Sequence, residues 1–545
     1  MAQTIVEYLI KRLNDMGVEN IFGVPGDYNF HILEAVQNND KTEWIGCCNE
    51  LNAGYAADGY ARIKGLGAII TTFGVGELSA INAVAGSYAE NVPVIKIVGM
   101  PNKHARDAKK VIHHCLGAED YHTFYDIYSK VTAHSVILTK ENAQEEIEEA
   151  LSVAYHQKKP VYIAIYNDFC TSPINITTQE FEIKKSDKKV LNEAVNHILE
   201  LAEKAETPVI ISDHPIMRYR LQKQMNELVK KTGFPATVLS MGKSSIDETL
   251  GNFLGTYCGT MLCDNMGKFI EKSDFVLGFG LLMTDLNSGG FTSNIDSDSF
   301  VDIQANYIKV QGKEYRNIYI WDVLEKLIEN INPKKVEILQ KTTYYETTEA
   351  TDKDLNQNYI YSALQNFLSS GDIYVTETGL SSFSSIGIKL PKDVDYCNQV
   401  LWGSIGWGTP ACFGAGMADK NRRVIMITGE GSHQMTAQEL SSMLRYGINP
   451  IIIVVNNQGY TIERLLCDDP MEKYNDIAKW DYTKFIEAFD GEVLTFKAKT
   501  EKDFYDALNT ARRSEKLVYI EAFTPIMDAT DFVYKMCSKV APVNQ

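Results

Sequence analysis

The stretch RVIMITGEGSHQMTAQELSSMLRYGINPIIIVVNN, residues 423–457, decides the fold class. It places two short β-branched apolar runs, 423–429 and 450–457, on either side of a helical pattern that stops at Gly447. Runs that are apolar on both faces are typical of parallel strands covered by helices. The stretch therefore predicts a strand, a tight turn at 429–433, a helix and a second strand.

The same alternation of strand and helix patterns runs through the whole chain. Further strand-like runs lie at 67–74, 92–99, 160–166, 208–213, 274–280 and 372–379. This order predicts an α/β protein whose parallel sheets are flanked by helices. Polar stretches at 173–189 and 340–358 are expected boundaries, and they divide the chain into three domains at 1–180, 190–340 and 355–545.

Composition excludes several classes of protein. The 545 residues carry 53 basic and 71 acidic side chains, a net charge of −18. An acidic body is not attracted to nucleic acid or to an anionic membrane surface, so neither is an expected partner. The amino terminus, MAQTIVEYLIKRLNDMG, interrupts its apolar residues with charges and predicts an amphipathic helix instead of a signal peptide. No apolar run reaches the length of a membrane span.

The cysteines indicate a reducing compartment. Ten cysteines are scattered through the chain, and Cys258 and Cys263 do not have the spacing of zinc ligands. A secreted protein of this size would use such residues in disulfides, whereas cytosolic proteins keep them reduced. The sequence therefore predicts free thiols and a cytoplasmic location.

Polar residues follow both strands of the opening stretch. Glu430 and Asn457 come at the carboxyl ends of the two runs, where ligands bind in parallel sheets. Gly431 and Ser432 offer backbone N–H groups that suit a phosphate. A carboxylate, an amide oxygen and a backbone carbonyl suit Mg²⁺. The alternative interpretation is a simple turn at Glu430 and a helix cap at the asparagines.

Further motifs favour the metal and phosphate interpretation, because together they resemble one family. The Glu430 turn followed by Asn456–Asn457 resembles the thiamine diphosphate signature G-D-G…N-N, with glutamate in place of the usual aspartate. The segment CCNELNAGYAADGYAR (47–62) looks like the glutamate motif of the same family. The other matching segments are FGVPGDYNF (22–30), TTFGVGELSA (71–80), KVIHHCLG (110–117), LWGSIGW (401–407) and GYTIE (459–463).

This set is similar to that of pyruvate decarboxylase and its relatives, the indolepyruvate, phenylpyruvate and branched-chain 2-keto acid decarboxylases, over nearly the whole chain. The resemblance implies a pyrimidine-binding domain at 1–180, a middle domain at 190–340 and a diphosphate- and Mg²⁺-binding domain at 355–545. It also implies that the cofactor lies between the first domain of one subunit and the third domain of another. A homodimer is then the smallest active unit, and a homotetramer is expected.

The resemblance assigns roles residue by residue. Glu50 is expected to hydrogen-bond the aminopyrimidine ring, and Ile405 to support the bent cofactor. The implied catalytic residues are Asp27, Glu50, His113, His114 and Glu463. The implied cofactor contacts are Glu50, Thr378, Gly379, Gly403, Ile405, Gly431, Ser432, Asn457 and Tyr460. The implied metal ligands are Glu430, Asn457 and Gly459. The implied substrate pocket consists of Phe291, Thr378, Ser382, Phe383, Ile462 and Met536.

The implied reaction is the non-oxidative decarboxylation of a 2-keto acid to an aldehyde and carbon dioxide. The expected substrate is a branched-chain or aromatic 2-keto acid, or pyruvate. Two alternatives remain open: a carboligase such as acetolactate synthase, and a weakened regulatory subunit, which Glu430 and Leu380 would suit. The five retained acidic and imidazole side chains favour the decarboxylase.

Overall fold

The computed structural model describes residues 3–174, 176, 181–259, 261–338, 341–342 and 344–544, with side chains in the last helix as far as residue 538. The expected domain limits at 180 and 340 fall outside these residues. The chain forms two compact units. One unit contains Met1–Ile183, Gly406–Asn421 and Thr436–Ile448, and the other contains Lys184–Ile405, Arg422–Met435 and Asn449–Gln545.

The amino-terminal segment forms a six-stranded parallel sheet in the order β3-β2-β4-β5-β7-β6. Its strands are β2 (Asn20–Gly23), β3 (Glu43–Gly46), β4 (Gly67–Thr72), β5 (Val94–Met100), β6 (His134–Leu138) and β7 (Val161–Tyr166). A short antiparallel pair, β1 (Gln3–Thr4) and β8 (Pro173–Ile174), joins the two ends of this segment. The predicted α/β class with parallel sheets is confirmed.

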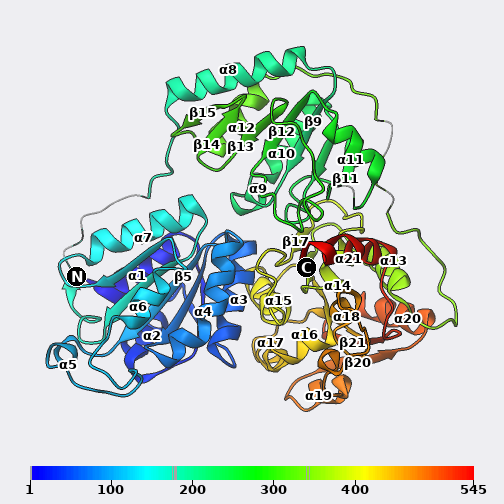
Figure 1. The fold of residues 1–545 in the computed structure, drawn as a ribbon. Coiled ribbons are helices and arrows are strands. Elements are labelled where there is room, and N and C mark those ends of the chain that lie inside the picture. Colours follow the sequence, from blue (N-terminus) through cyan, green and yellow to red (C-terminus); the bar gives the residue numbers. More distant parts are fainter. Residues whose placement is uncertain are drawn as a thin grey trace. The chain divides into compact units, whose positions relative to one another are not determined.

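Helices cover both faces of this sheet (Figure 1). One face carries α1 (Ile5–Asp15), α2 (Phe30–Gln37) and α7 (Ala143–Gln157), and the other carries α3 (Glu50–Lys64), α4 (Val75–Ala89) and α6 (Thr123–Tyr128). Strand β5 shows why the sequence run is apolar throughout. Ile95 and Ile97 pack on the first face, and Val98 and Met100 pack on the second. The short elements η1 (Asp27–Asn29) and α5 (Lys103–Asp107) complete the segment.

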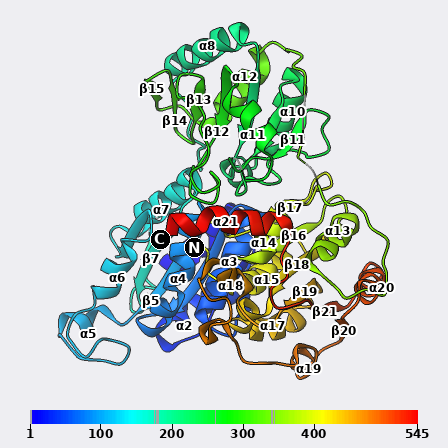
Figure 2. The same cartoon turned by 45° about the vertical axis from the view of Figure 1, so that its right-hand side comes forward.

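The same unit includes three elements from far along the chain: α15 (Gly408–Ala418), η2 (Ala437–Glu439) and α17 (Leu440–Arg445). Helix α15 packs on α3 through small residues (Figure 2). A methyl group on Gly414 would lie 1.8 Å from the Ala56 carbonyl oxygen, and one on Gly59 would lie 2.1 Å from the Ala411 carbonyl oxygen. The two backbones therefore touch, which only glycine permits.

We expect Gly414→Ala to destabilise the protein by about 1–3 kcal/mol, because the two helices must move apart to admit the methyl group. Urea unfolding measures the change. Gly251→Ala is the matched control, since a methyl group there meets nothing within 4 Å. Equal stability of the two variants would show that the helices do not pack this closely.

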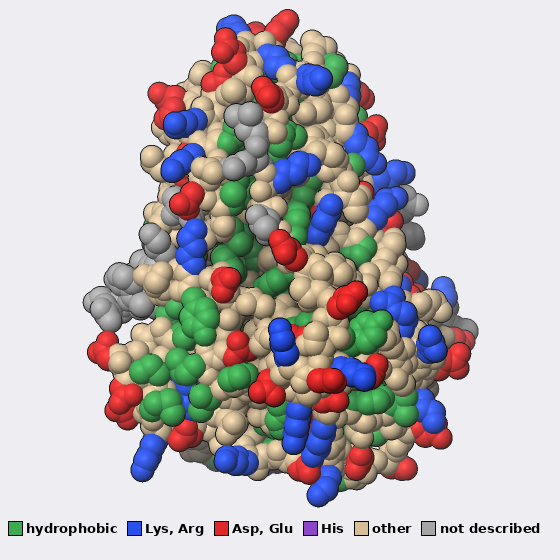
Figure 3. All heavy atoms as spheres, turned by 90° about the vertical axis from the view of Figure 1, so that its right-hand side faces the viewer, with side chains coloured by type: hydrophobic (Ala, Val, Ile, Leu, Met, Phe, Trp, Pro, Cys, Tyr) green, Lys and Arg blue, Asp and Glu red, His purple; other side chains and the backbone are tan. Residues whose placement is uncertain are grey.

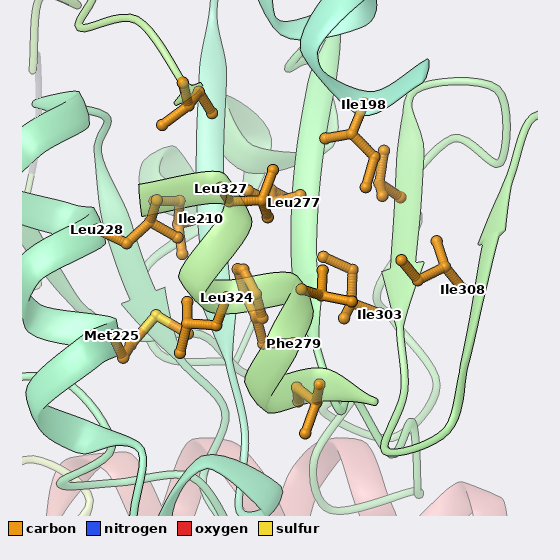
Figure 4. Packing of buried hydrophobic residues seen from close by; sticks show 14 of the residues in the cluster. Ile198, Ile210, Met225, Leu228, Leu277, Phe279, Ile303, Ile308, Leu324 and Leu327 are labelled. Carbon is orange, nitrogen blue, oxygen red and sulfur yellow. The ribbon is translucent and has the colours of Figure 1, made fainter. Parts of the chain in front are cut away.

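The second unit begins with a mixed seven-stranded sheet in the order β11-β10-β9-β12-β13-β14-β15, in which β14 runs antiparallel to both of its neighbours and the other pairs are parallel. Its strands are β9 (Pro208–Ser212), β10 (Ala236–Val238), β11 (Phe253–Thr256), β12 (Phe275–Phe279), β13 (Phe300–Ile303), β14 (Tyr307–Val310) and β15 (Lys313–Arg316). Helices α8 (Lys188–Lys204), α10 (Gln222–Thr232) and α12 (Ile320–Asn330) cover one face, and α11 (Asp264–Glu271) covers the other. Short helix α9 (Pro215–Arg218) follows β9. Figure 4 shows Leu228 beside Ile210 of the sheet and Leu327 beside Leu277, and Met225 and Leu324 belong to the same cluster.

The carboxyl-terminal sheet is again six-stranded and parallel, in the order β17-β16-β18-β19-β21-β20. Its strands are β16 (Ile373–Thr376), β17 (Asp395–Cys397), β18 (Val424–Gly429), β19 (Ile451–Asn456), β20 (Val493–Ala498) and β21 (Leu517–Phe523). Its helices in the second unit are α13 (Gln357–Phe367), α14 (Leu380–Ser385), α16 (Glu430–Gln434), α18 (Thr461–Leu466), α19 (Tyr482–Glu487), α20 (Glu501–Ala511) and α21 (Asp531–Asn544), with η3 (Lys473–Asn475) after α18.

The opening stretch differs from its prediction in two respects. The predicted turn at 429–433 is mostly the short helix α16, and the helix predicted after it is preceded by a break and consists of η2 and α17. The break lies at Thr436, whose φ of −140° is not helical and whose hydroxyl donates a 2.7 Å hydrogen bond to the Gly406 carbonyl. A side chain that bonds a distant backbone group competes with helix continuation.

A buried ion pair ties the middle sheet to the segment after α14. Lys243 Nζ lies 2.8 Å from Glu248 Oε1 and donates to the Ile388 carbonyl at 2.7 Å. Glu248 Oε2 accepts from the Leu390 N–H at 2.9 Å. Both charged side chains are almost fully buried. The charges of the pair are therefore satisfied within the protein.

We expect Lys243→Met to cost about 3–5 kcal/mol of unfolding free energy, because it leaves the Glu248 charge buried and unpaired. Lys326→Met, in an exposed pair with Glu329, should change stability by less than about 1 kcal/mol. Denaturant unfolding compares the two. The double variant Lys243→Met/Glu248→Gln should recover much of the loss, and a single variant as stable as wild type would contradict the structure.

Figure 3 shows one face on which acidic and basic side chains are interspersed. Within the described residues, no helix combines the length and the apolar character that a membrane span needs.

Candidate active site

Glu430 lies where the sequence places it, immediately after strand β18. Its side chain is 1% exposed. Oε1 accepts hydrogen bonds from the backbone N–H groups of Asn457 at 3.1 Å and Gly459 at 2.9 Å. These bonds join the end of β18 to the loop that follows β19. Burial raises the pKa of Glu430 to about 7, and the backbone N–H donors oppose that rise.

Two oxygens at this point are buried without a protein donor in the described part of the chain. They are Glu430 Oε2 and Asn457 Oδ1. An unsatisfied buried oxygen costs about 1–3 kcal/mol, and more when it is charged. A divalent cation would satisfy both oxygens, and carboxylate and amide oxygens are ligands that Mg²⁺ accepts. The residues present therefore fit a bound Mg²⁺ ion, and the turn interpretation leaves these two oxygens unexplained.

Both residues line a cavity of about 270 Å³. Gly459, which lines this cavity, has a φ of 142°, a conformation that favours glycine. A side chain at this position would lie 2.4 Å from the Asn475 carbonyl oxygen. Most of the predicted cofactor contacts surround the same space. Those that line it are Thr378, Gly379, Ile405, Gly431, Ser432, Asn457, Gly459 and Tyr460, together with Ile462 and Glu463. Gly403 does not line the cavity but lies beside Thr378.

An apolar cluster lies close to this cavity. Phe383 and Ile462 pack with Met536 and Val533 of helix α21. Ser382 is buried beside them, and its hydroxyl donates to the Gly379 carbonyl at 3.3 Å. Five of the six predicted pocket residues are therefore gathered here or line the cavity. Phe291 is the exception, because its side chain is 63% exposed and lies outside the cluster.

The other predicted catalytic residues meet within the first unit. His113 Nε2 lies 2.8 Å from Asp27 Oδ2, although the two residues are 86 positions apart in the sequence. Tyr28 stacks on the His113 ring with centroids 4.7 Å apart, and the His114 ring meets His113 edge-on at 4.7 Å. The potential ligand atoms of Asp27, His113 and His114 all lie within 4.8 Å of one another. This cluster can hold or pass a proton.

Glu50 is the first residue of helix α3, where the helix dipole favours a carboxylate. Its side chain is half-buried, and Oε1 lies 3.1 Å from the position that a methyl group on Gly76 would take. Gly76 therefore leaves room for the carboxylate. The chain holds its predicted site residues in two sets: Asp27, Glu50, His113 and His114 in the first unit, and Glu430, Asn457, Ile405 and Glu463 in the second.

Sequence reasoning missed a buried polar network beside Glu50. It consists of Glu77 on α4, Lys96 on β5 and Tyr162 on β7, all fully or almost fully buried. The available signal was Lys96 itself, a single charge within the apolar run VPVIKIVG. Gln357 and Thr461, which also line the cavity, carried no recognisable signal.

Comparison with known proteins gives a consistent result over the whole chain. Three family models of thiamine pyrophosphate enzymes match: the N-terminal TPP binding domain at residues 3–123, the central domain at 195–330 and the C-terminal TPP binding domain at 378–522. A putative pyruvate decarboxylase of Schizosaccharomyces pombe is 38% identical over 574 aligned positions, which cover 99% of this chain and 98% of the relative.

Two further relatives also match over almost the full length of this chain. Pyruvate decarboxylase isozyme 3 of Saccharomyces cerevisiae is 35% identical, and pyruvate decarboxylase of Hanseniaspora uvarum is 36% identical, each covering 99% of both chains. Such membership implies thiamine diphosphate with Mg²⁺ as the cofactor pair. The chain therefore belongs to the thiamine pyrophosphate enzymes, within the family of thiamine diphosphate-dependent 2-keto acid decarboxylases.

Proposed function

We propose that the protein converts a 2-keto acid with an apolar side chain into an aldehyde and carbon dioxide, and that Glu430, Asn457 and the Gly459 carbonyl hold Mg²⁺. The observation that carries the proposal is the pair of orphan oxygens on Glu430 and Asn457, which line one cavity with Ile405 and Glu463. When bound, thiamine diphosphate takes up the electron pair that departing carbon dioxide leaves behind.

The residues of the second unit would bind and orient the cofactor. The backbone N–H groups of Gly431 and Ser432 suit the diphosphate, because each carries a partial positive charge at the start of α16. Ile405, which lines the cavity, would support the cofactor, and the Gly403 carbonyl would accept a hydrogen bond from its amino group. The remaining contacts come from Thr378, Gly379 and Tyr460. These assignments follow the family motifs that the segments match.

The residues of the first unit move protons. Glu50 would exchange a proton with the aminopyrimidine ring, and Asp27, His113 and His114 would supply the protons that release of the aldehyde needs, together with Glu463 of the second unit. Coupled groups of this kind titrate as a set. The proposal keeps the expected division into a pyrimidine-binding domain at 1–180, a middle domain at 190–340 and a diphosphate- and Mg²⁺-binding domain at 355–545.

The substrate side chain is proposed to lie against Phe383, Ile462 and Met536, with Thr378 and Ser382 nearby and Phe291 as a sixth contact. The flexible thioether of Met536 adapts to different shapes. This supports a range that includes branched-chain and aromatic 2-keto acids as well as pyruvate, the substrate named for the relatives.

The test is aldehyde release from pyruvate, 2-ketoisovalerate, phenylpyruvate and indolepyruvate, each with and without thiamine diphosphate and Mg²⁺. We expect aldehyde only when both are present. Acetolactate without aldehyde would replace the proposal with a carboligase. Bound cofactor without any product would replace it with a regulatory subunit.

The proposal also includes a homodimer as the smallest active unit, a homotetramer as the assembly and a cytoplasmic location. Its support is that the two sets of site residues belong to different compact units, and that all ten cysteines, which lie within the described residues, are outside disulfide bonds. Light scattering during dilution, with activity followed in parallel, tests the assembly. Full activity of a monomer would refute it.

A further inference from the structure

Strand β5 carries a single lysine, Lys96, and its side chain is 0% exposed. Nζ donates hydrogen bonds to Thr71 Oγ1 and, at 3.3 Å, to the Ile97 carbonyl. It also lies 5.9 Å from the centre of the Tyr128 ring. A buried ammonium group is costly unless negative charge lies nearby. The surroundings of Lys96 supply that charge from two glutamates.

The first of these is Glu77, which is also fully buried. Its Oε1 accepts from the Gly74 N–H at 2.7 Å, and its Oε2 accepts from the Tyr162 hydroxyl at 2.8 Å. Burial raises the pKa of Glu77 and lowers the pKa of Lys96 to about 7, and the charge of each group opposes the shift of the other. The two buried groups therefore interact electrostatically, without a direct hydrogen bond between these two described residues.

The second is Glu50, the residue assigned to cofactor activation. Glu50 Oε1 and Thr71 Cβ lie against the same glycine, at 3.1 and 3.3 Å from where a methyl group on Gly76 would be. Thr71 in turn receives the hydrogen bond from Lys96. The charge of Glu50 acts on Lys96 in the same sense as that of Glu77. Thr71 is thus a neighbour of both the lysine and the Glu50 carboxylate.

We propose that Lys96 is a positioning residue for cofactor activation, and that its buried ammonium group stabilises the ionised Glu50 carboxylate. The inference rests on the proposed function, in which Glu50 passes its proton to a ring nitrogen of the cofactor. In that step the Glu50 O–H bond breaks, an N–H bond forms and Lys96 keeps its protons. A nearby positive charge favours the carboxylate that results, so activation becomes easier.

The titratable groups that face Lys96 from the described elements packed around it are Glu50 on α3, Glu77 on α4, Tyr128 on α6 and Tyr162 on β7. Burial raises the pKa of both tyrosines well above 10, so they stay neutral. The charge of Lys96 near neutral pH is therefore set by its burial and by the two glutamates.

The test uses the holoenzyme and the double variant Lys96→Met/Glu77→Gln, which removes both buried charges and leaves neither one unpaired. The amide oxygen introduced by Glu77→Gln can still accept the N–H of Gly74, so the start of α4 keeps its hydrogen bond. Replacing a buried pair by neutral groups is often without cost in stability. The readout is the rate at which the C2 proton of bound thiamine diphosphate exchanges with deuterium, followed by quenched-flow NMR across pH 6–9, alongside urea unfolding.

We expect the double variant to remain folded, to exchange at least about tenfold more slowly, and to lose the inflection that Lys96 deprotonation gives to the wild-type pH profile near pH 7. The matched control is Lys64→Met/Glu19→Gln, a partly exposed pair in the same unit at 2.7 Å, which should leave the exchange rate unchanged. A wild-type rate in the Lys96 double variant, or a retained inflection, overturns the inference and leaves the pair a purely structural role.

Two further measurements separate this inference from the proposed function. If wild-type protein does not accelerate exchange above that of free thiamine diphosphate, the proposed function itself fails. If wild type accelerates exchange, Glu50→Gln abolishes the acceleration and the Lys96 double variant keeps it, only the inference about Lys96 fails.

Discussion

Glu50→Gln should lower the turnover number by roughly 10²–10⁴-fold, the range that a positioned acid or base contributes. The amide keeps the size of the carboxyl group but cannot exchange a proton with the ring nitrogen. Glu50 begins helix α3, so losing its charge costs at most about 1 kcal/mol of helix stabilisation. Steady-state decarboxylation assays with saturating cofactor measure the effect, and circular dichroism confirms the fold.

The control for this substitution is Glu149→Gln, which makes the same chemical change at an exposed position of α7. Its turnover should equal that of wild type. If Glu50→Gln also keeps wild-type turnover, Glu50 is an ordinary helix-start acid, and the proposed proton exchange needs another group.

Glu430→Gln should weaken Mg²⁺ binding by at least about 100-fold, since even the outer partners of metal ligands contribute 10–100-fold to affinity. Glutamine can still accept the backbone N–H groups of Asn457 and Gly459 through its oxygen. Its amide nitrogen then takes the place of the orphan Oε2, and a nitrogen that carries two hydrogens repels a cation. Isothermal titration with Mg²⁺ in the presence of thiamine diphosphate measures the change.

Glu430→Asp tests the same position by shortening the side chain while keeping its carboxylate. Aspartate is one methylene shorter, so it cannot both receive the two N–H groups and reach the same cation, and Mg²⁺ tolerates little departure from octahedral geometry. Its affinity should differ from wild type, whereas Glu515→Gln, at an exposed position of the same unit, should not change it. Unaltered Mg²⁺ affinity in both Glu430 variants would return Glu430 to the role of a turn residue.

Local sequence patterns predicted the central strands and part of the candidate site. The apolar runs predicted the central strands, because a strand that is buried on both faces needs apolar side chains at nearly every position. Glu430 and Asn457 were predicted to be neighbours because the carboxyl ends of parallel strands meet at one edge. The close approach of Asp27 and His113 was implied only by the family motifs, since nothing local links residues so far apart.

Other features depended on long-range packing. The break at Thr436 required a carbonyl group thirty residues upstream, at Gly406. The contact of α3 with α15 required Gly59 to lie against Ala411 and Gly414 to lie against Ala56, residues that are far apart in the sequence. The resemblance assigned Phe291 to the substrate pocket, and the structure adds that its side chain is 63% exposed and lies outside the apolar cluster.

The sequence by itself thus determined the fold class, through the periodicity of its apolar residues, and the cofactor family, through motifs that resemble that family. The same resemblance named the acids that we propose carry the chemistry. Only the tertiary structure decided that two oxygens beside Glu430 and Asn457 lack partners, and that Lys96 lies buried between Glu77 and the threonine next to Glu50. The reason is that burial and electrostatic partners arise from residues that are distant in sequence, and neither is written in any local pattern.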